Sequence, residues 1–326
     1  MRLGGPARFM AEVRSIDELI ALHANAKSKQ LPIFILGGGS NVIAFDEGYP
    51  GLIIRMRIPG FAIIADDTSS MTIKIGAGED WDEVVKRTVD MRLSGIEAMS
   101  AIPGTAGAAP VQNVGAYGQE IADTLQSLEA LDTTTGQLVT LTNEQCGFSY
   151  RHSIFRGDEK GRYIITSITL KLWKSLPQPP FYDSLQAYFD KLAITIFTHQ
   201  TVRDAVIAIR KEKLPDPKEV ANTGSFFKNA IIESWRLDEL VQKYPDVKTF
   251  DMGDGTVKVP SGWLIEKAGL KGTSLHGMKV YEKNALVLIN ETAEHYADLA
   301  AARDEIIGKV RDTFQIIIEQ EPLELR

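Results

Sequence analysis

The sequence contains a single cysteine, Cys146, among 326 residues. One thiol excludes an intrachain disulfide and fits a reducing compartment. The five histidines show no HExxH or comparable ligand spacing, so we expect no metal site. No apolar run is long enough to span a bilayer, and the N-terminus lacks the apolar core of a secretion signal. These absences predict a cytoplasmic protein that is not attached to a membrane.

The charge and composition are those of a globular enzyme or binding protein. Hydrophobic residues make up 44% and charged residues 24% of the chain. Thirty-six basic and 43 acidic residues give a net charge of −7, which offers no general reason to expect nucleic acid as a partner. The length exceeds what one ordinary core supports, so two or three domains are expected.

The first 60 residues predict a small α+β unit. Ser15 and Glu18 form an S-x-x-E capping box that starts a helix over 15–29. Strands are expected at 31–36, 42–45 and 52–58.

A glycine-rich segment, Gly37-Gly38-Gly39-Ser40-Asn41, lies between the first two of these strands. It is not a Rossmann fingerprint, because the spacing is wrong and a strand follows it. The segment fits either a nest of backbone N–H groups around a pyrophosphate or a tight hairpin that needs positive φ. Taken alone, the pattern slightly favours the hairpin.

The middle of the chain predicts a sheet and a ligand loop. Alternation over 71–75 indicates a strand, and Asp80 caps the helix that follows. Further strands are expected at 125–131, 137–141 and 163–172. Residues 102–118 are rich in Gly, Pro and Ala. They favour backbone exposed to a large planar ligand over an ordinary loop, with Asn113 and Tyr117 as polar groups.

The C-terminal part begins after a proline-rich loop or lid at 173–185. A helix must stop near Leu214, because Pro215 cannot continue it. Further helices are predicted near 231–243, 260–268 and 293–314. Strands are predicted at 285–290 and 316–318, the second of which docks the tail.

Three further motifs are Gly147-Phe-Ser-Tyr-Arg-His-Ser-Ile-Phe155, Lys213-Leu-Pro-Asp-Pro217 and Gly224-Ser-Phe-Phe-Lys-Asn229. They carry a resemblance to a known family that runs over essentially the whole chain, and the motifs occur in the same order as in that family. Together with the glycine loops, they resemble the UDP-N-acetylenolpyruvoylglucosamine reductases. The resemblance implies an α+β fold, with an FAD-binding module of two subdomains (PCMH or vanillyl-alcohol-oxidase-like) and a C-terminal α+β substrate-binding domain. The expected boundaries are 1–60 and 61–200 for the FAD subdomains, 201–318 for the substrate domain and 319–326 for a returning tail.

The resemblance also implies which residues bind the cofactor. Non-covalent FAD is expected at Gly37, Gly38, Gly39, Ser40, Asn41, Gly78, Pro103, Gly104, Asn113, Gly115, Ala116, Tyr117, Gly118 and Arg326. The GGGSN loop contains no histidine for covalent flavin attachment.

Three residues match the family's catalytic set. Arg151 is an arginine suited to bind a carboxylate, and its neighbour Tyr150 would face the opposite side if both lay on a strand. Ser225 matches the serine that protonates the substrate. Glu324 matches the C-terminal acid, and Glu321 is the alternative.

The resemblance implies substrate-binding roles for Tyr150, Tyr182, Arg210, Lys213 and Asn229, with Tyr182 on the loop of the long (type I) form. Arg210 and Lys213 lie three residues apart on one helix face. They fit either solvated charges that favour the helix dipole or a clamp for phosphates.

The activity implied is the reduction of UDP-N-acetylglucosamine enolpyruvate by NADPH through FAD, in a bacterial monomer of peptidoglycan synthesis. Two other classes are weighed. An FAD-dependent oxidase or dehydrogenase on the same scaffold would not need the KLPDP and GSFFKN motifs. A non-catalytic binding protein for a nucleotide sugar or flavin would not need a proton donor beside an acid.

Overall fold

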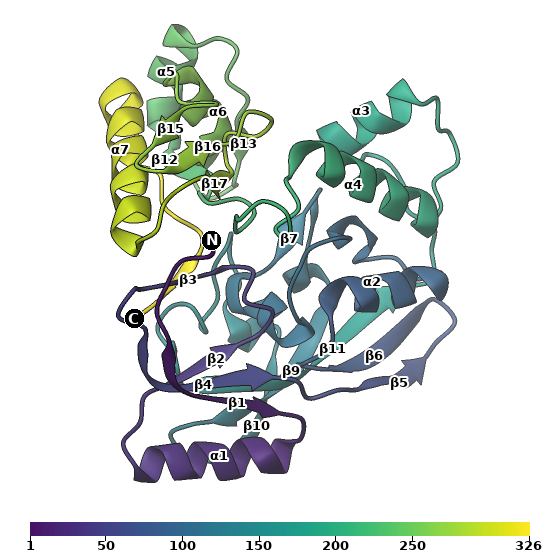
Figure 1. Cartoon of the computed structure of the whole chain (residues 1–326). Coiled ribbons are helices and arrows are strands. Elements are labelled where there is room, and N and C mark those ends of the chain that lie inside the picture. The colour runs from purple at the N-terminus through teal and green to yellow at the C-terminus, as the bar shows by residue number, and fades with distance from the viewer. The chain divides into compact units, whose positions relative to one another are not determined.

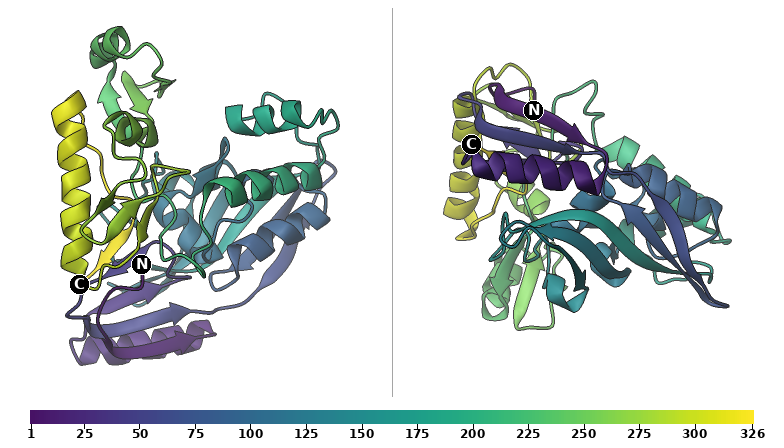
Figure 2. Two further views of the ribbon diagram at one scale, coloured as in Figure 1. Left: turned by 45° about the horizontal axis from the view of Figure 1, so that its top comes forward. Right: turned by 90° about the horizontal axis from the view of Figure 1, so that it is seen from below.

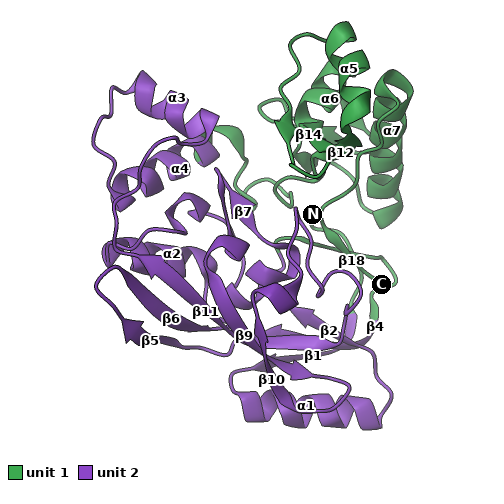
Figure 3. Ribbon diagram, turned by 180° about the vertical axis from the view of Figure 1, so that it is seen from behind, with its two compact units in different colours: residues 1–6, 40–49, 211–326 green, residues 7–39, 50–210 purple.

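The computed structural model describes residues 1–326, which divide into two compact units (Figure 3). Unit 1 contains residues 1–6, 40–49 and 211–326, and unit 2 contains residues 7–39 and 50–210. Figure 1 labels most of the helices and strands of both units. None of the helices has the length and apolar character needed to cross a membrane.

Unit 2 begins with a three-stranded sheet in the order β1 (Ala7–Val13), β4 (Tyr49–Met56), β2 (Ile33–Leu36). Strands β2 and β4 are parallel. Helix α1 (Ile16–Ser28) lies alongside these strands and buries Leu19, His23 and Ala26 (Figure 2).

The capping box predicted for α1 forms only in part. The Ser15 hydroxyl accepts a hydrogen bond from the Glu18 N–H at 3.1 Å, as expected of an N-cap. The Glu18 carboxylate does not return to Ser15, however, and accepts instead from the Arg14 N–H at 2.7 Å.

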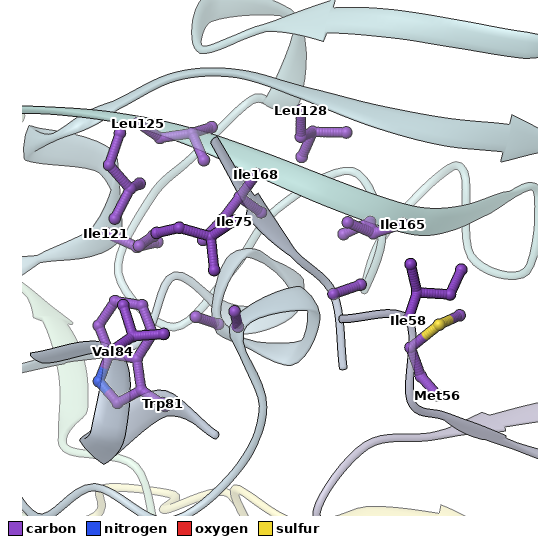
Figure 4. Packing of buried hydrophobic residues seen from close by; sticks show 14 of the residues in the cluster. Met56, Ile58, Ile75, Trp81, Val84, Ile121, Leu125, Leu128, Ile165 and Ile168 are labelled. Atoms are coloured by element: carbon purple, nitrogen blue, oxygen red, sulfur yellow. The ribbon is translucent and has the colours of Figure 1, made fainter. Parts of the chain in front are cut away.

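The second sheet of unit 2 has five antiparallel strands in the order β10 (Leu138–Thr142), β9 (Leu125–Asp132), β11 (Tyr163–Trp173), β6 (Ser70–Gly76), β5 (Phe61–Asp66). The predicted strands at 71–75, 125–131, 137–141 and 163–172 are confirmed. Helix α2 (Trp81–Asp90) packs into the same core through Trp81 and Val84, which Figure 4 shows beside Ile75 and Ile168.

The remaining elements of unit 2 are short, apart from two helices. The segment 102–118 contains the 3₁₀ helix η2 (Ala106–Gln112) and strand β7 (Gly115–Ala116), which pairs with β8 (Gln119–Glu120). Three more 3₁₀ turns are η1 (Glu97–Met99), η3 (Ile121–Asp123) and η4 (Glu144–Cys146). Helix α3 (Asp183–Lys191) begins inside the predicted lid, and α4 (His199–Lys213) ends before Leu214 as predicted.

Unit 1 holds three small sheets. The first has the strand order β12 (Ala230–Glu233), β14 (Thr256–Val259), β13 (Phe250–Asp251). The second has the order β15 (Ser274–Leu275), β16 (Met278–Val280), β17 (Leu288–Asn290). The third pairs β18 (Leu323–Leu325) with β3 (Val42–Ala44). Its helices are η5 (Ser234–Arg236), α5 (Leu237–Lys243), α6 (Ser261–Lys267) and α7 (Tyr296–Phe314). The long helix α7 packs its apolar face on this core through Leu299, Ile306 and Val310.

Three sequence predictions fail in unit 1. Residues 231–233 are part of strand β12 and not of a helix, and residues 316–318 form no strand although Ile316 and Ile318 are buried. The predicted strand at 285–290 is limited to Leu288–Asn290. The hairpin interpretation of 37–41 is also wrong, because β2 pairs with β4 whereas β3 pairs with β18.

Candidate active site

The glycine segment 37–39 packs against the loop at 104–105 within unit 2. A Cβ on Gly37 would lie 2.7 Å from Thr105 Oγ1, and one on Gly38 would lie 2.9 Å from Gly104 Cα. At Gly38, two backbones therefore touch at a point where only a hydrogen side chain fits. This contact joins the two loops that the sequence nominates for the cofactor.

The N–H groups of Gly38, Gly39 and Gly104 make no hydrogen bond within the protein. Gly38 and Gly39 are exposed, and Gly39 has φ +73°. Unpaired backbone donors on glycine-rich turns form the kind of nest that binds a phosphate. The segment thus fits the pyrophosphate of a flavin dinucleotide. Pro103, next to Gly104, is also exposed.

Gly78 has a packing role that accounts for it without a ligand. A Cβ there would lie 2.3 Å from the backbone carbon of Arg57, and the Gly78 N–H donates to the Ile58 carbonyl at 2.8 Å.

The loop at 113–118 is a tight hairpin. Gly115 and Ala116 pair with β8, and Tyr117 and Gly118 at its tip have φ +49° and +86°. Two successive positive φ values are typical of a type I′ turn. Asn113 is fully buried and uses its side chain inside the protein, donating to the Ser149 carbonyl and accepting from the Ala122 N–H.

Arg151 lies in a turn. Ser149 and His152 form an isolated bridge around it, and Arg151 has φ +52°. Its guanidinium donates to the carbonyls of Asn113 at 3.3 Å and Gly115 at 2.7 Å. The guanidinium is therefore fixed beside the 113–118 hairpin, and it lies 5.4 Å from the centre of the Tyr150 ring.

Arg210 is not a solvated charge. Its Nε donates to the Ala101 carbonyl at 3.2 Å, and burial lowers the pKa of Arg210, an effect that its contacts with Tyr117 and Asp82 oppose. The Tyr182 ring, which is half-exposed, stands edge-on to Tyr117 with the centroids 6.2 Å apart. Arg210 and two predicted ligand tyrosines thus gather in unit 2.

Lys213, by contrast, is exposed at the end of α4 and forms no ion pair.

In unit 1, the segment containing Ser225 has backbone partners on both sides. Ser225 bridges Val287, and the Phe226 N–H donates to the Leu286 carbonyl at 2.7 Å. On the other side the C-terminal tail docks, since the Lys228 N–H donates to the Glu319 carbonyl at 2.9 Å. The backbone of Ser225 is held while its hydroxyl makes no hydrogen bond.

Asn229 has a structural contact beside its predicted substrate role. Its Oδ1 accepts from the Ser261 N–H at 3.2 Å at the start of α6.

Glu324 lies on β18 opposite Ile43 of β3, so the tail is docked as predicted. Its carboxylate accepts hydrogen bonds from the Tyr296 hydroxyl at 2.6 Å and from Arg303 at 2.8 Å. Burial raises its pKa, but the contacts with Tyr296, Arg303 and Gln320 outweigh burial and leave the pKa of Glu324 below its ordinary value. Arg326 is exposed and lies 5.9 Å from the centre of the Phe45 ring.

The fallback acid, Glu321, donates its backbone N–H to the Phe226 carbonyl at 2.8 Å. Tyr296 and Arg303 were not among the predicted site residues. Nothing in the sequence of α7 connects them to a tail more than 20 residues away, so only the fold brings them together.

Comparison with known families identifies the two parts of the chain. Residues 7–142 match the model of the FAD binding domain, which defines the protein as a flavin-binding oxidoreductase. Residues 216–324 match the model of the C-terminal domain of UDP-N-acetylenolpyruvoylglucosamine reductase.

Curated proteins give the same family over the full length. The UDP-N-acetylenolpyruvoylglucosamine reductase of Cupriavidus pinatubonensis is 40% identical and covers 98% of this chain and 94% of its own. That of Ralstonia nicotianae is 38% identical, with 99% and 95% covered. The crystal structure of the UDP-N-acetylenolpyruvylglucosamine reductase from Thermus caldophilus matches this structure with a TM-score of 0.66 at 23% identity. The match covers 99% of this chain and 94% of that chain. The chain belongs to the UDP-N-acetylenolpyruvoylglucosamine reductase family.

Proposed function

We propose that this protein reduces UDP-N-acetylglucosamine enolpyruvate to UDP-N-acetylmuramate in peptidoglycan precursor synthesis, with NADPH as the reductant. When bound, FAD would supply the redox chemistry, the transfer of a hydride from NADPH by way of its N5 to C3 of the enolpyruvyl group. The chain's own residues bind the substrate, stabilise the charge that develops on it and deliver a proton to C2.

The observation that carries the proposal is the position of the Ser225 segment in unit 1. This segment lies next to the tail at 319–321, and the tail leads directly into Glu324. Two residues that are 99 positions apart in sequence thereby belong to one backbone framework. The Ser225 hydroxyl has no internal partner, so it is free to donate a proton at C2.

Arg151 and Glu324 take complementary roles in this proposal. The guanidinium of Arg151 remains charged and binds the enolpyruvyl carboxylate. Together with Arg151, Glu324 stabilises the enol-type intermediate that develops at C2 and its carboxylate. The remaining substrate-binding residues in this proposal are Tyr150, Tyr182, Arg210, Lys213 and Asn229. Arg326 contacts the flavin.

The free N–H groups of Gly38, Gly39 and Gly104 hold the flavin pyrophosphate. Ser40, Asn41, Pro103 and the 113–118 hairpin line the rest of the cofactor site. The protein acts in the cytoplasm as a monomer.

Separate half-reactions test the role of Ser225. In anaerobic stopped-flow, Ser225→Ala is expected to leave flavin reduction by NADPH within about twofold of the wild type. Reoxidation by the enolpyruvyl substrate is expected to slow by about 10²–10⁴-fold, the usual contribution of a proton donor. Ser274→Ala, whose hydroxyl bonds Glu291 elsewhere in unit 1, is the matched control. Equal loss in both half-reactions would show that the serine has no specific role in protonation.

A further inference from the structure

Helix α7 directs two side chains at the C-terminal carboxylate. Tyr296 and Arg303 are seven residues apart, which places them two turns apart on one face of the helix. The Tyr296 hydroxyl and the Arg303 guanidinium both donate to Oε1 of Glu324. Gln320 adds a third donor, its Nε2, to the same oxygen at 3.2 Å.

Only one oxygen of the Glu324 carboxylate is hydrogen-bonded within the protein. All three hydrogen bonds end on Oε1, and Oε2 accepts none. The Glu324 side chain is 19% exposed, as is typical of a group at the wall of a site and not in a core. Fixing one oxygen sets the rotamer of the side chain and leaves the other oxygen available to a ligand.

The two donors are themselves held in place. The Tyr296 ring stacks on the Phe45 ring with the centroids 3.8 Å apart, and the backbone N–H of Tyr296 donates to Asp46 Oδ2 at 2.8 Å. Phe45 directly follows β3, the strand that pairs with Glu324 on β18. Arg303 also donates to Gln320 Oε1 at 2.9 Å and pairs with Asp304. The hydroxyl and the guanidinium therefore share one rigid framework with the carboxylate.

We propose that Tyr296 and Arg303 are positioning residues that orient Glu324 through Oε1, so that Oε2 faces the enolpyruvyl group of the substrate. This inference rests on the proposed function. The interaction is charge-assisted, and charge-assisted hydrogen bonds are both short and directional. Misplacement of a catalytic group by about 1 Å lowers rates by as much as 10²-fold, so loss of either donor affects the step that uses Glu324.

Tyr296→Phe is the first variant, because it removes the hydroxyl and keeps the ring on Phe45. Arg303→Gln removes the charge, and Arg303→Lys restores it. Arg311→Gln is the matched control: Arg311 lies on the same helix and pairs with the next residue, Asp312, as Arg303 does with Asp304. Unchanged near-ultraviolet circular dichroism establishes that each variant is folded.

Two readouts are measured on each variant. The first is the pKa of Glu324 by NMR with ¹³C-labelled glutamate, assigned by loss of the signal in Glu324→Gln. Tyr296→Phe and Arg303→Gln are expected to raise it, and Arg303→Lys and Arg311→Gln are expected to leave it nearly unchanged. The second is the pair of half-reactions. Substrate-driven reoxidation is expected to fall about tenfold or more in Tyr296→Phe and Arg303→Gln, with NADPH reduction within twofold.

The wild-type protein distinguishes failure of the proposed function from failure of the positioning role. If the wild-type reduced flavin is not reoxidised by the enolpyruvyl substrate, the proposed function fails and this inference fails with it. If the wild type turns over and Tyr296→Phe reoxidises at the wild-type rate, the positioning role alone is overturned. A Glu324 pKa that stays the same in both Tyr296→Phe and Arg303→Gln overturns it as well.

Discussion

Arg203 donates to both carboxylate oxygens of Asp82, at 2.6 and 2.9 Å, and thereby ties α4 to α2 within unit 2. The same Asp82 carboxylate accepts from the Ala101 N–H at 2.6 Å, where the backbone has φ +58°. Arg210, two turns further along α4, binds the Ala101 carbonyl. The backbone N–H and the carbonyl of Ala101 are thus both held, just before Pro103 and Gly104 of the candidate flavin site.

Arg203→Met is expected to destabilise the protein by roughly 2–3 kcal/mol, because it leaves the Asp82 carboxylate without its charge partner. This is less than the roughly 3–5 kcal/mol usual for a fully buried pair, because the Asp82 side chain is 31% exposed. The free energy of unfolding from urea titration measures the effect, and the FAD content of the purified protein should fall with it. Gln200→Ala, which removes an exposed contact with Asp204 on the same helix, is the control.

The pH dependence of this loss provides a second check. Burial raises the pKa of Asp82, but the hydrogen bonds from Arg203 and Ala101 outweigh it, so the folded-state pKa lies below its ordinary value. A lowered folded-state pKa gives stability that is present above the unfolded value of about 3.9 and disappears as pH falls through the folded value. The difference between wild type and Arg203→Met should shrink below about pH 4. A constant difference from pH 7 to pH 3 would contradict the charge-pair explanation.

Local signals in the sequence predicted local structure well. Asp80 caps α2 by accepting from the Glu83 N–H at 3.1 Å, and α4 ends at Lys213 because Pro215 follows. Both effects act within one helical turn, so the residues that determine them are visible in a short window. The family motifs added the fold class, which no single window contains.

Interactions between distant residues were beyond such windows. The segment around Gly37–Asn41 looked like a hairpin because two strand-like runs flank it, but β3 pairs with Leu323–Leu325 at the other end of the chain. The large sequence separation also explains the error in the tail. The apolar run from Ile316 to Ile318 was predicted to be the strand, whereas pairing with β3 places the strand at 323–325. The turn at Arg151 was also not predicted, because its positive φ left no sequence signal.

The single thiol should be inert in the folded protein. Burial raises the pKa of Cys146 to about 12, and its Sγ lies 3.2 Å from the Thr142 carbonyl as a hydrogen-bond donor. Because the thiolate is the reactive form, almost none is available at pH 8. We expect less than about 0.1 thiol per chain to react with a chromogenic disulfide reagent in native buffer, and one full equivalent in denaturant. Rapid reaction of the native protein would show that the region around η4 opens readily.

Gly38→Ala tests whether the contact between the two glycine loops supports flavin binding. The added Cβ would lie 2.9 Å from Gly104 Cα and 3.4 Å from its N and C atoms. Every one of these atoms is backbone, so no side chain can rotate away and the loops must separate. Separation displaces the N–H groups of Gly38 and Gly104 from a shared phosphate. We expect flavin affinity to fall about tenfold or more, measured by fluorescence titration of the apoprotein.

Gly308→Ala supplies the control for this substitution, since it makes the same chemical change at a position on α7 where the nearest atom is an Arg311 nitrogen at 4.0 Å. It should keep flavin affinity and increase stability by up to about 1 kcal/mol, because alanine is the better helix former. If Gly38→Ala binds flavin as tightly as Gly308→Ala, the loops tolerate separation. The phosphate nest would then lie in the 113–118 hairpin instead, whose tip also has positive φ. If only Gly38→Ala loses flavin and both remain folded, close backbone approach is what the triple glycine provides.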